Sequence, residues 1–274
     1  MMTVIAHDGT KLHVEDSGGT GRPVVLIHGW PLSGESWAPQ VPALRDARLR
    51  VITYDRRGFG RSDKPAAGYD YDYLAADLQA VIEEVDLRDL SLVGFSMGGG
   101  EVARYLSRYG ADRVRSVVFA SAVPPYLAKT AKNPDGPLDK ERAGEMLTAL
   151  QVHRHAFFDD FTTQLLSANG NLAVGENVQR DTMCQALQSD QSAAEECLKA
   201  WATTDFRADL AAVTVPALII HGDSDALVPF EGSGQRTHDA IEGSQLHVIK
   251  GGPHGVTMSH ADEWNNIVGR FLAR

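Results

Sequence analysis

Short apolar runs rich in Val and Ile alternate with helical stretches through the first third of this 274-residue chain. Apolar residues recur at helical spacing over 73–85, and a second helix is predicted over 97–109, ended by Gly110. The apolar runs are too short for helices, and we expect strands at 24–27, 51–54, 91–95 and 114–120. This alternation, with nearly continuous apolar strands, predicts a mostly parallel sheet covered by helices on both faces.

The alternation stops near residue 121 and resumes near residue 213; between them the pattern is helical, broken by loop stretches such as 133–137 and 169–171. Strands are expected again at 217–221 and 246–249, followed by a final helix, and an antiparallel hairpin is expected at 3–15. We therefore predict a core made of residues 1–120 and 213–274, and a helical lid at 121–212. Open α/β sheets bind ligands at the carboxyl ends of their strands, where such an insertion would pack. The alternative is a surface insertion with no part in a site.

Composition excludes several classes of function. The net charge of −10 disfavours nucleic acid and anionic membranes as partners, and no apolar run reaches the length of a membrane span. No signal peptide is recognisable, so a cytoplasmic location is expected, with Cys184 and Cys197 unpaired. No phosphate-binding loop or spaced metal-ligand set occurs, and we expect neither cofactor nor metal.

A G-x-S-x-G turn stands between the predicted strand at 91–95 and the helix that leaves from Met97. Such a reversal imposes strained dihedral angles on Ser96 and leaves no room for side chains at Gly94 and Gly98. The turn exposes the Ser96 hydroxyl at a helix N-terminus, where developing negative charge is stabilised. Ser96 is therefore the predicted nucleophile; the alternative is a tight glycine-rich turn with an incidental serine.

A nucleophilic serine needs a base that is itself held by a third group. His254 lies in a Gly- and Pro-rich loop directly after the strand at 246–249, which suits a site better than a core. Asp223 and Asp225 follow the strand at 217–221, and both are candidates for the acid. Asp223 suits capping of the turn, whereas Asp225 lies nearer the expected site, so spacing favours Asp225. His221 is expected to bond to neighbouring backbone.

The strand at 24–27 ends in His28-Gly29-Trp30-Pro31-Leu32. An oxyanion needs two preorganised donors, and the backbone N–H groups of Trp30 and Met97 are the candidates. His28 is expected to brace this loop. The Trp30 ring can equally be a core aromatic, since only its amide is required.

Several of these segments resemble one family. The segments are His28–Ser33, Tyr54–Ser62, Gly94–Glu101, Thr204–Arg207, His221–Asp225 and Pro253–Gly255. Together they resemble the cofactor-free haloperoxidases, aryl esterases and perhydrolases of the α/β-hydrolase superfamily, a group that includes γ-lactamases. The resemblance covers nearly the whole chain and is weakest at 125–200.

This resemblance implies an α/β-hydrolase fold, with a mostly parallel eight-stranded sheet and a lid. In that family the second aspartate of the G-D-x-D turn is the acid, which selects Asp225. The implied activity is hydrolysis of small carboxylic esters through an acyl-enzyme. Hydrogen peroxide can replace water, and the released peracid then oxidises halide. Cleavage of γ-lactams is the alternative reaction on the same triad, and homo-oligomers are common in the family.

The resemblance also implies a pocket. Its expected residues are Pro31, Phe157, Phe161, Leu227, Val228 and Phe230. Phe157 and Phe161 share a helix face, which fits a lid core equally well. Pro31 follows the oxyanion-loop aromatic, as in members that favour perhydrolysis. Proline fixes its backbone and lacks a donor, so the adjacent carbonyl is expected to lie toward the site and to accept a hydrogen bond from peroxide. The other interpretation of Pro31 is a residue that ends the strand.

Other functions occur on the same scaffold, and each differs from ester hydrolysis in what it requires of the sequence. Haloalkane dehalogenases and epoxide hydrolases share the scaffold but need an acidic nucleophile where Ser96 stands, whereas a carbon–carbon bond hydrolase differs in its pocket. A receptor-like binding protein on the same fold would not need a complete triad. Arg56 and Arg57 are expected to be structural rather than to bind a charged substrate.

Overall fold

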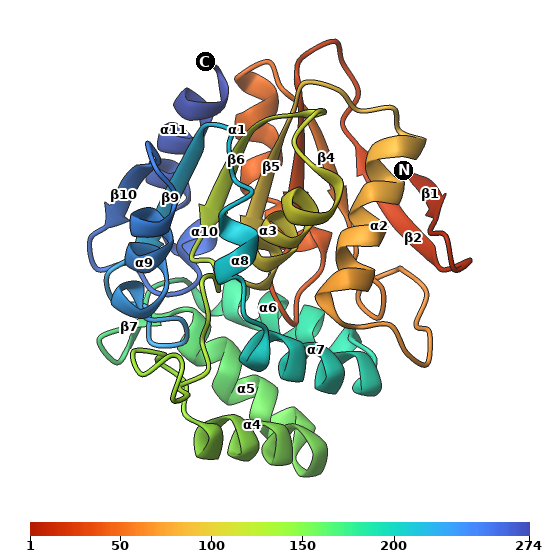
Figure 1. The fold of residues 1–274 in the computed structure, drawn as a ribbon. Helices are drawn as coiled ribbons and strands as arrows, with labels where there is room; N and C mark the ends of the chain where they lie inside the picture. The colour runs from red at the N-terminus through yellow and green to blue at the C-terminus, as the bar shows by residue number, and fades with distance from the viewer.

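The computed structural model describes all residues from 1 to 274. Eight strands form one sheet in the order β1-β2-β4-β3-β5-β6-β9-β10 (Figure 1). Their bounds are β1 Met2–Ile5, β2 Lys11–Asp16, β3 Pro23–Ile27, β4 Arg50–Tyr54, β5 Leu90–Phe95, β6 Val114–Ala120, β9 Ala217–Gly222 and β10 Gln245–Ile249. Only the pairings β1–β2 and β2–β4 are antiparallel, so the predicted mostly parallel eight-stranded sheet is confirmed.

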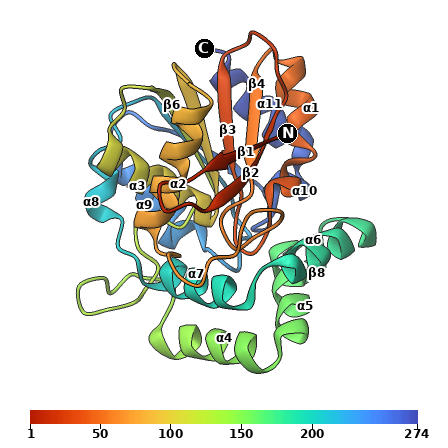
Figure 2. The ribbon, with the colours of Figure 1, turned by 90° about the vertical axis from the view of Figure 1, so that its right-hand side faces the viewer.

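Helices cover both faces of the sheet (Figure 2). One face carries α1 Gln40–Asp46, α10 Val256–Ser259 and α11 Ala261–Leu272; the other carries α2 Tyr71–Glu84, α3 Met97–Tyr109, α8 Arg207–Leu210 and α9 Gly234–Ala240. Two 3₁₀ turns complete this part, η1 Gly34–Trp37 and η2 Phe230–Gly232. The side chain of Asp70 caps α2 by accepting from the N–H groups of Asp72 and Tyr73, and the apolar stripe of α2 packs inward.

Four further helices lie together beyond the sheet, at the lower end of the views in Figures 1 and 2. These lid helices are α4 Lys140–Val152, α5 Arg154–Leu165, α6 Glu176–Gln188 and α7 Gln191–Thr203. They contact the loops that leave the carboxyl ends of the strands: Asp190 N–H donates to Gly58 O at 2.8 Å and Gly255 N–H donates to Leu165 O at 2.7 Å. Buried lid side chains such as Phe158 and Leu198 belong to the same apolar cluster as the sheet.

Within 121–212 the loop expected at 133–137 is confirmed, but the structure departs from the expected helical pattern in two places. Residues 121–139 contain no helix, because prolines interrupt them and the Asn133 side chain donates to the carbonyls of Tyr126 and Ala128. The loop expected at 169–171 contains the turn of a short hairpin, whose strands β7 Ser167–Ala168 and β8 Asn171–Leu172 were not expected. Asn169 and Gly170 both have positive φ, which is the geometry of a two-residue hairpin turn.

Strand order determines where loops meet. β5 lies beside β3, and the chain then continues outward through β6, β9 and β10. The order therefore reverses between β3 and β5, and open α/β sheets bind ligands outside such a reversal. The loops after β3, β5, β9 and β10 all leave the same edge of the sheet. Judged by length and hydropathy, every helix falls short of what a membrane span needs.

Candidate active site

Ser96 occupies the one residue between β5 and α3, with φ 54° and ψ −116°. This is a strained conformation for a residue with a side chain, and such strain costs about 1–3 kcal/mol. Close backbone contacts make the turn feasible only with glycine on either side. A Cβ at Gly94 would lie 2.4 Å from Gly98 O, and one at Gly98 would lie 2.4 Å from Ile27 O. The turn thus holds the Ser96 hydroxyl at the end of the sheet.

His254 lies in the loop after β10 and reaches Ser96. Its Nε2 is 2.8 Å from Ser96 Oγ, and its ring packs against Phe95 at 5.2 Å between centroids. The imidazole is almost fully buried, with 2% of the residue exposed. The next residue, Gly255, donates its N–H to Leu165 O of α5, so the loop is bonded to the lid.

Asp225 lies behind His254 and completes a chain of three side chains. Its Oδ2 is 2.7 Å from His254 Nδ1, and its Oδ1 accepts from the N–H groups of Leu227 and Val228. Burial favours the neutral acid, but His254 and the hydrogen bonds from His221 and His254 outweigh it and hold the pKa of Asp225 well below its ordinary value. The carboxylate is therefore ionised and aimed at His254.

The other candidate acid, Asp223, makes different contacts. It is exposed, and its Oδ1 accepts from Gly251 N–H at 2.6 Å and from the Ser224 hydroxyl. It thereby joins the turns after β9 and β10. The structure brings Asp225, not Asp223, to His254.

The loop after β3 brings Trp30 into the same region. Trp30 N–H has no hydrogen-bond acceptor within the protein, and Met97 is the first residue of α3, where a backbone N–H lacks an intrahelical acceptor. Both amides are thus available to a negatively charged oxygen. The peptide bond between Trp30 and Pro31 is cis. The indole Nε1–H of Trp30 donates to Ala194 O of α7 at 3.1 Å.

A buried ion pair braces this loop. Arg56 donates to His28 O at 2.7 Å and, through its guanidinium Nε, to Glu101 Oε1 at 2.5 Å. Arg56 N–H donates to His28 Nε2, so His28 carries its proton on Nδ1 and donates to Gly29 O. Burial and the Arg56 charge hold the pKa of His28 well below its ordinary value, which keeps the ring neutral. Tyr54 donates to the other Glu101 oxygen at 2.6 Å.

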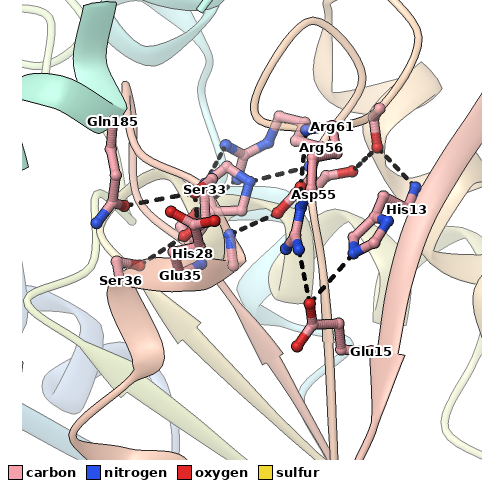
Figure 3. A network of polar contacts seen from close by, with 12 residues as sticks. His13, Glu15, His28, Ser33, Glu35, Ser36, Asp55, Arg56, Arg61 and Gln185 are labelled. Atoms are coloured by element: carbon pink, nitrogen blue, oxygen red, sulfur yellow. Dashed lines mark hydrogen bonds and ion pairs between the residues drawn. The ribbon is translucent and has the colours of Figure 1, made fainter. Parts of the chain in front are cut away.

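A second polar network anchors the turn that follows the loop (Figure 3). Asp55 accepts from Gly34 N–H at 2.8 Å and from Arg61 N–H at 2.9 Å. The Arg61 guanidinium also pairs with Glu15 at 2.7 Å. Ser33 Oγ lies 3.4 Å from Gln185 Oε1 of α6, so this network reaches the lid as well as the core.

A cavity of about 440 Å³ lies between the lid helices and the turn after Asp225. Three of the six expected pocket residues line it: Phe157, Phe161 and Leu227. Leu138, Met146 and Trp201 add apolar surface, whereas Arg142, Glu145, His153 and Asp160 add charged and polar groups. The Phe161 ring, which lines this cavity, meets the Trp30 ring edge-on at 4.9 Å.

The other expected pocket residues, Pro31, Val228 and Phe230, do not line this cavity. Because the cavity contains no residue of the triad, the expectation for Pro31 and Phe230 stays a prediction, whereas that for Val228 needs correction. Val228 is fully buried and bonds through its backbone to Asp225 and His221, because the chain turns inward after β9. Phe230 packs against the His221 ring at 5.7 Å between centroids. A larger groove of about 700 Å³, between α1 and α6, likewise contains no residue of the triad.

Sequence reasoning missed two residues of this region. Glu101 stands in a segment that carried the resemblance, but its buried pairing with Arg56 is not visible in local pattern. His221 was expected to bond only to backbone, yet its Nε2 also lies 3.1 Å from Asp225 Oδ2. The spacing of four residues between His221 and Asp225 was the only available signal. The expectation that Arg56 and Arg57 are structural is confirmed, since both are buried and paired.

Comparison with known proteins agrees with this geometry. A family model described as the alpha/beta hydrolase fold matches residues 22–261. The non-heme haloperoxidase of Rhodococcus erythropolis is 39% identical over 274 residues, which is 99% of either chain. The bifunctional esterase/perhydrolase of Acinetobacter calcoaceticus is 35% identical over 98% of either chain. The crystal structure of a bromoperoxidase from Bacillus anthracis matches with a TM-score of 0.97 and 49% identity, covering 100% of this chain and 99% of that one.

Proposed function

Because this chain belongs to the haloperoxidase and esterase family of α/β hydrolases, we propose that it is a serine hydrolase acting on small carboxylic and aryl esters. In this proposal Ser96 is the nucleophile, His254 the base and Asp225 the acid. The observation that carries it is the continuous hydrogen-bonded chain, 2.8 Å from Ser96 Oγ to His254 and 2.7 Å from His254 to Asp225.

Acylation begins when Ser96 Oγ attacks the ester carbonyl carbon and passes its proton to His254 Nε2. The negative charge on the carbonyl oxygen is stabilised by the N–H groups of Trp30 and Met97. Asp225 stabilises the imidazolium that forms and keeps the ring oriented. Collapse of the tetrahedral intermediate breaks the ester C–O bond, and the leaving alcohol takes the proton back from His254. The acyl group then remains on Ser96.

Deacylation repeats these steps with water or hydrogen peroxide as the attacking group. Water releases the carboxylic acid and restores the Ser96 hydroxyl. Hydrogen peroxide releases a peracid instead, and His254 serves again as base. The peracid transfers one oxygen atom to a halide ion, which with a proton gives hypohalous acid and the carboxylic acid. This route supports peroxide-dependent halogenation as an activity of the same triad.

The surroundings of the triad favour small, uncharged acyl groups. The rings of Trp30, Phe157 and Phe161 lie within 4.9–6.1 Å of one another and form an aromatic cluster beside the loop that carries the Trp30 amide. Arg56 and Arg57 are already paired with buried carboxylates, which leaves neither free to bind a charged acid.

A fluorophosphonate probe tests the proposal directly, because it phosphonylates an activated serine. The wild-type protein should gain one adduct, located at Ser96 by peptide mass spectrometry. Ser96→Ala should lose the adduct, ester hydrolysis and peroxide-dependent halogenation together, whereas Ser107→Ala, an exposed serine on α3, should keep all three. Halogenation that survives in Ser96→Ala would reveal a separate oxidant site. An unlabelled wild-type protein would favour a ligand-binding protein on this fold.

A further inference from the structure

His221 is a second imidazole bonded to the triad acid. It lies at the end of β9, is fully buried, and places Nε2 3.1 Å from Asp225 Oδ2 and 2.8 Å from Val228 O. Both hydrogen-bonding contacts of this buried ring are made by Nε2. These two contacts define the orientation of the ring.

The two contacts also determine the tautomer. Val228 O is only an acceptor, so His221 Nε2 carries the proton and donates. The other nitrogen, Nδ1, is buried and has no hydrogen-bond partner. A proton on Nδ1 would be buried without an acceptor, which is costly. The contacts thus favour the Nε2–H tautomer of His221.

As a result, Asp225 receives hydrogen bonds from four N–H groups. Two backbone amides, those of Leu227 and Val228, donate to Oδ1, whereas His254 and His221 both donate to Oδ2. The His221 bond prevents the carboxylate from turning Oδ2 away from His254. It also takes up part of the negative charge that would otherwise stabilise the His254 imidazolium.

We infer that His221 is a positioning residue for the proposed triad: its Nε2–H holds Asp225 Oδ2 toward His254 and tempers the basicity of His254. The inference rests on the proposed function, since it requires that His254 be the base.

The elements around His221 add no competing charge. Gly234 of α9 lies directly against the ring, so that a Cβ there would be 2.6 Å from Nδ1, and Phe230 of η2 packs on it. The titratable groups of this cluster are Asp225, which bonds to His221, and His254 behind it. A change in pH dependence on removing His221 can therefore be traced through Asp225 to His254.

Two substitutions separate the hydrogen bond from the volume of the ring. His221→Leu fills the space without a donor, whereas His221→Gln places an amide N–H near the position of Nε2. We expect His221→Leu to lower kcat about ten-fold with little change in KM, and to move the acid limb of the kcat/KM profile upward by about half a pH unit. His221→Gln should restore the wild-type limb and most of kcat. His7→Leu, an exposed histidine in the β1–β2 turn, is the control.

Each rate is divided by the concentration of fluorophosphonate-reactive sites, so that unfolded protein does not lower the value. An unmoved acid limb and an unchanged rate per site in His221→Leu would overturn the inference, even where wild-type labelling of Ser96 supports the proposed function. Should the leucine variant not fold, ¹⁵N NMR of histidine-labelled wild-type protein tests the tautomer. A neutral Nε2–H ring at position 221 is expected, and a proton on Nδ1 would overturn the inference.

Discussion

Asp223 and Asp225 stand two residues apart in one turn and bond to different parts of the molecule. Asp225 Oδ2 lies 2.7 Å from His254 Nδ1, whereas Asp223 Oδ1 accepts from the backbone N–H of Gly251 at 2.6 Å. One carboxylate is buried against an imidazole and the other is an exposed tie between two turns. Because both residues are aspartates, the same substitution to asparagine can be compared at the two positions.

Asp225→Asn should lower kcat for ester hydrolysis by about ten-thousand-fold, the size of effect known for the equivalent change in serine proteases. The amide neither stabilises the imidazolium nor enforces the tautomer that leaves Nε2 free for Ser96. Asp223→Asn should remain within about ten-fold of wild type, because it weakens only contacts outside the triad, to Gly251 N–H and the Ser224 hydroxyl. Steady-state hydrolysis of p-nitrophenyl acetate measures both, and equal losses would contradict the assignment of Asp225.

Acid should destabilise the wild type more steeply than Asp225→Asn. Because the folded-state pKa of Asp225 lies below its ordinary value, the carboxylate stabilises the fold above the unfolded pKa of about 4 and loses that contribution as pH falls toward the folded pKa. Below pH about 4, the difference in free energy of unfolding between the wild type and Asp225→Asn should shrink by about 1.4 kcal/mol per pH unit. Urea unfolding of both proteins from pH 3 to 7 measures this, and parallel curves would argue against it.

Pro31→Leu should lower the ratio of peracid formation to ester hydrolysis several-fold. Leucine adds an N–H and frees a backbone angle that the proline ring restricts, which changes the position of the neighbouring Trp30 carbonyl. On the interpretation that Pro31 favours perhydrolysis, that carbonyl accepts a hydrogen bond from peroxide. Parallel assays with and without peroxide give the ratio, and an unaltered ratio removes Pro31 from the reaction.

Phe161→Ala should lower the free energy of unfolding and allow hydrolysis of esters with longer acyl groups. The ring is buried against Trp30, and its removal costs about 3–5 kcal/mol. The space created between Trp30 and the lid cavity should raise the kcat/KM ratio of hexanoate to acetate esters about ten-fold. Leu187→Ala, on the exposed side of α6, is the control and should change neither quantity. Thermal unfolding and an ester panel test both parts.

Glu101→Gln should destabilise the protein by about 3–5 kcal/mol, because Arg56 would keep a buried charge without its partner. Since Arg56 also holds the His28 carbonyl, esterase activity should fall as well. Glu145→Gln, in an exposed pair with Arg142, should cost less than about 1 kcal/mol. Urea unfolding measures the free energy of unfolding of both variants. Equal losses would show that the buried pair contributes no more to stability than the exposed pair.

Much of the fold was predictable because it follows from local pattern. The strand at 114–120 and the helix at 97–109 were predicted with their observed bounds, since their apolar spacing is unambiguous. The short hairpin at 167–172 was missed because two-residue strands carry no periodicity, although Asn169-Gly170 is a typical hairpin turn. The domain boundaries at 121 and 213 stay predictions.

The chain by itself determined the strand–turn–helix around Ser96 and placed His254 just after a strand, because those features depend on neighbouring residues. Tertiary structure decided which aspartate meets His254, how Glu101 pairs with Arg56, and that His221 shares the Asp225 carboxylate. Contacts between residues far apart in the chain arise from strand order and burial, which no local pattern encodes. Even the four-residue step from His221 to Asp225 becomes a contact only because the chain turns back after β9.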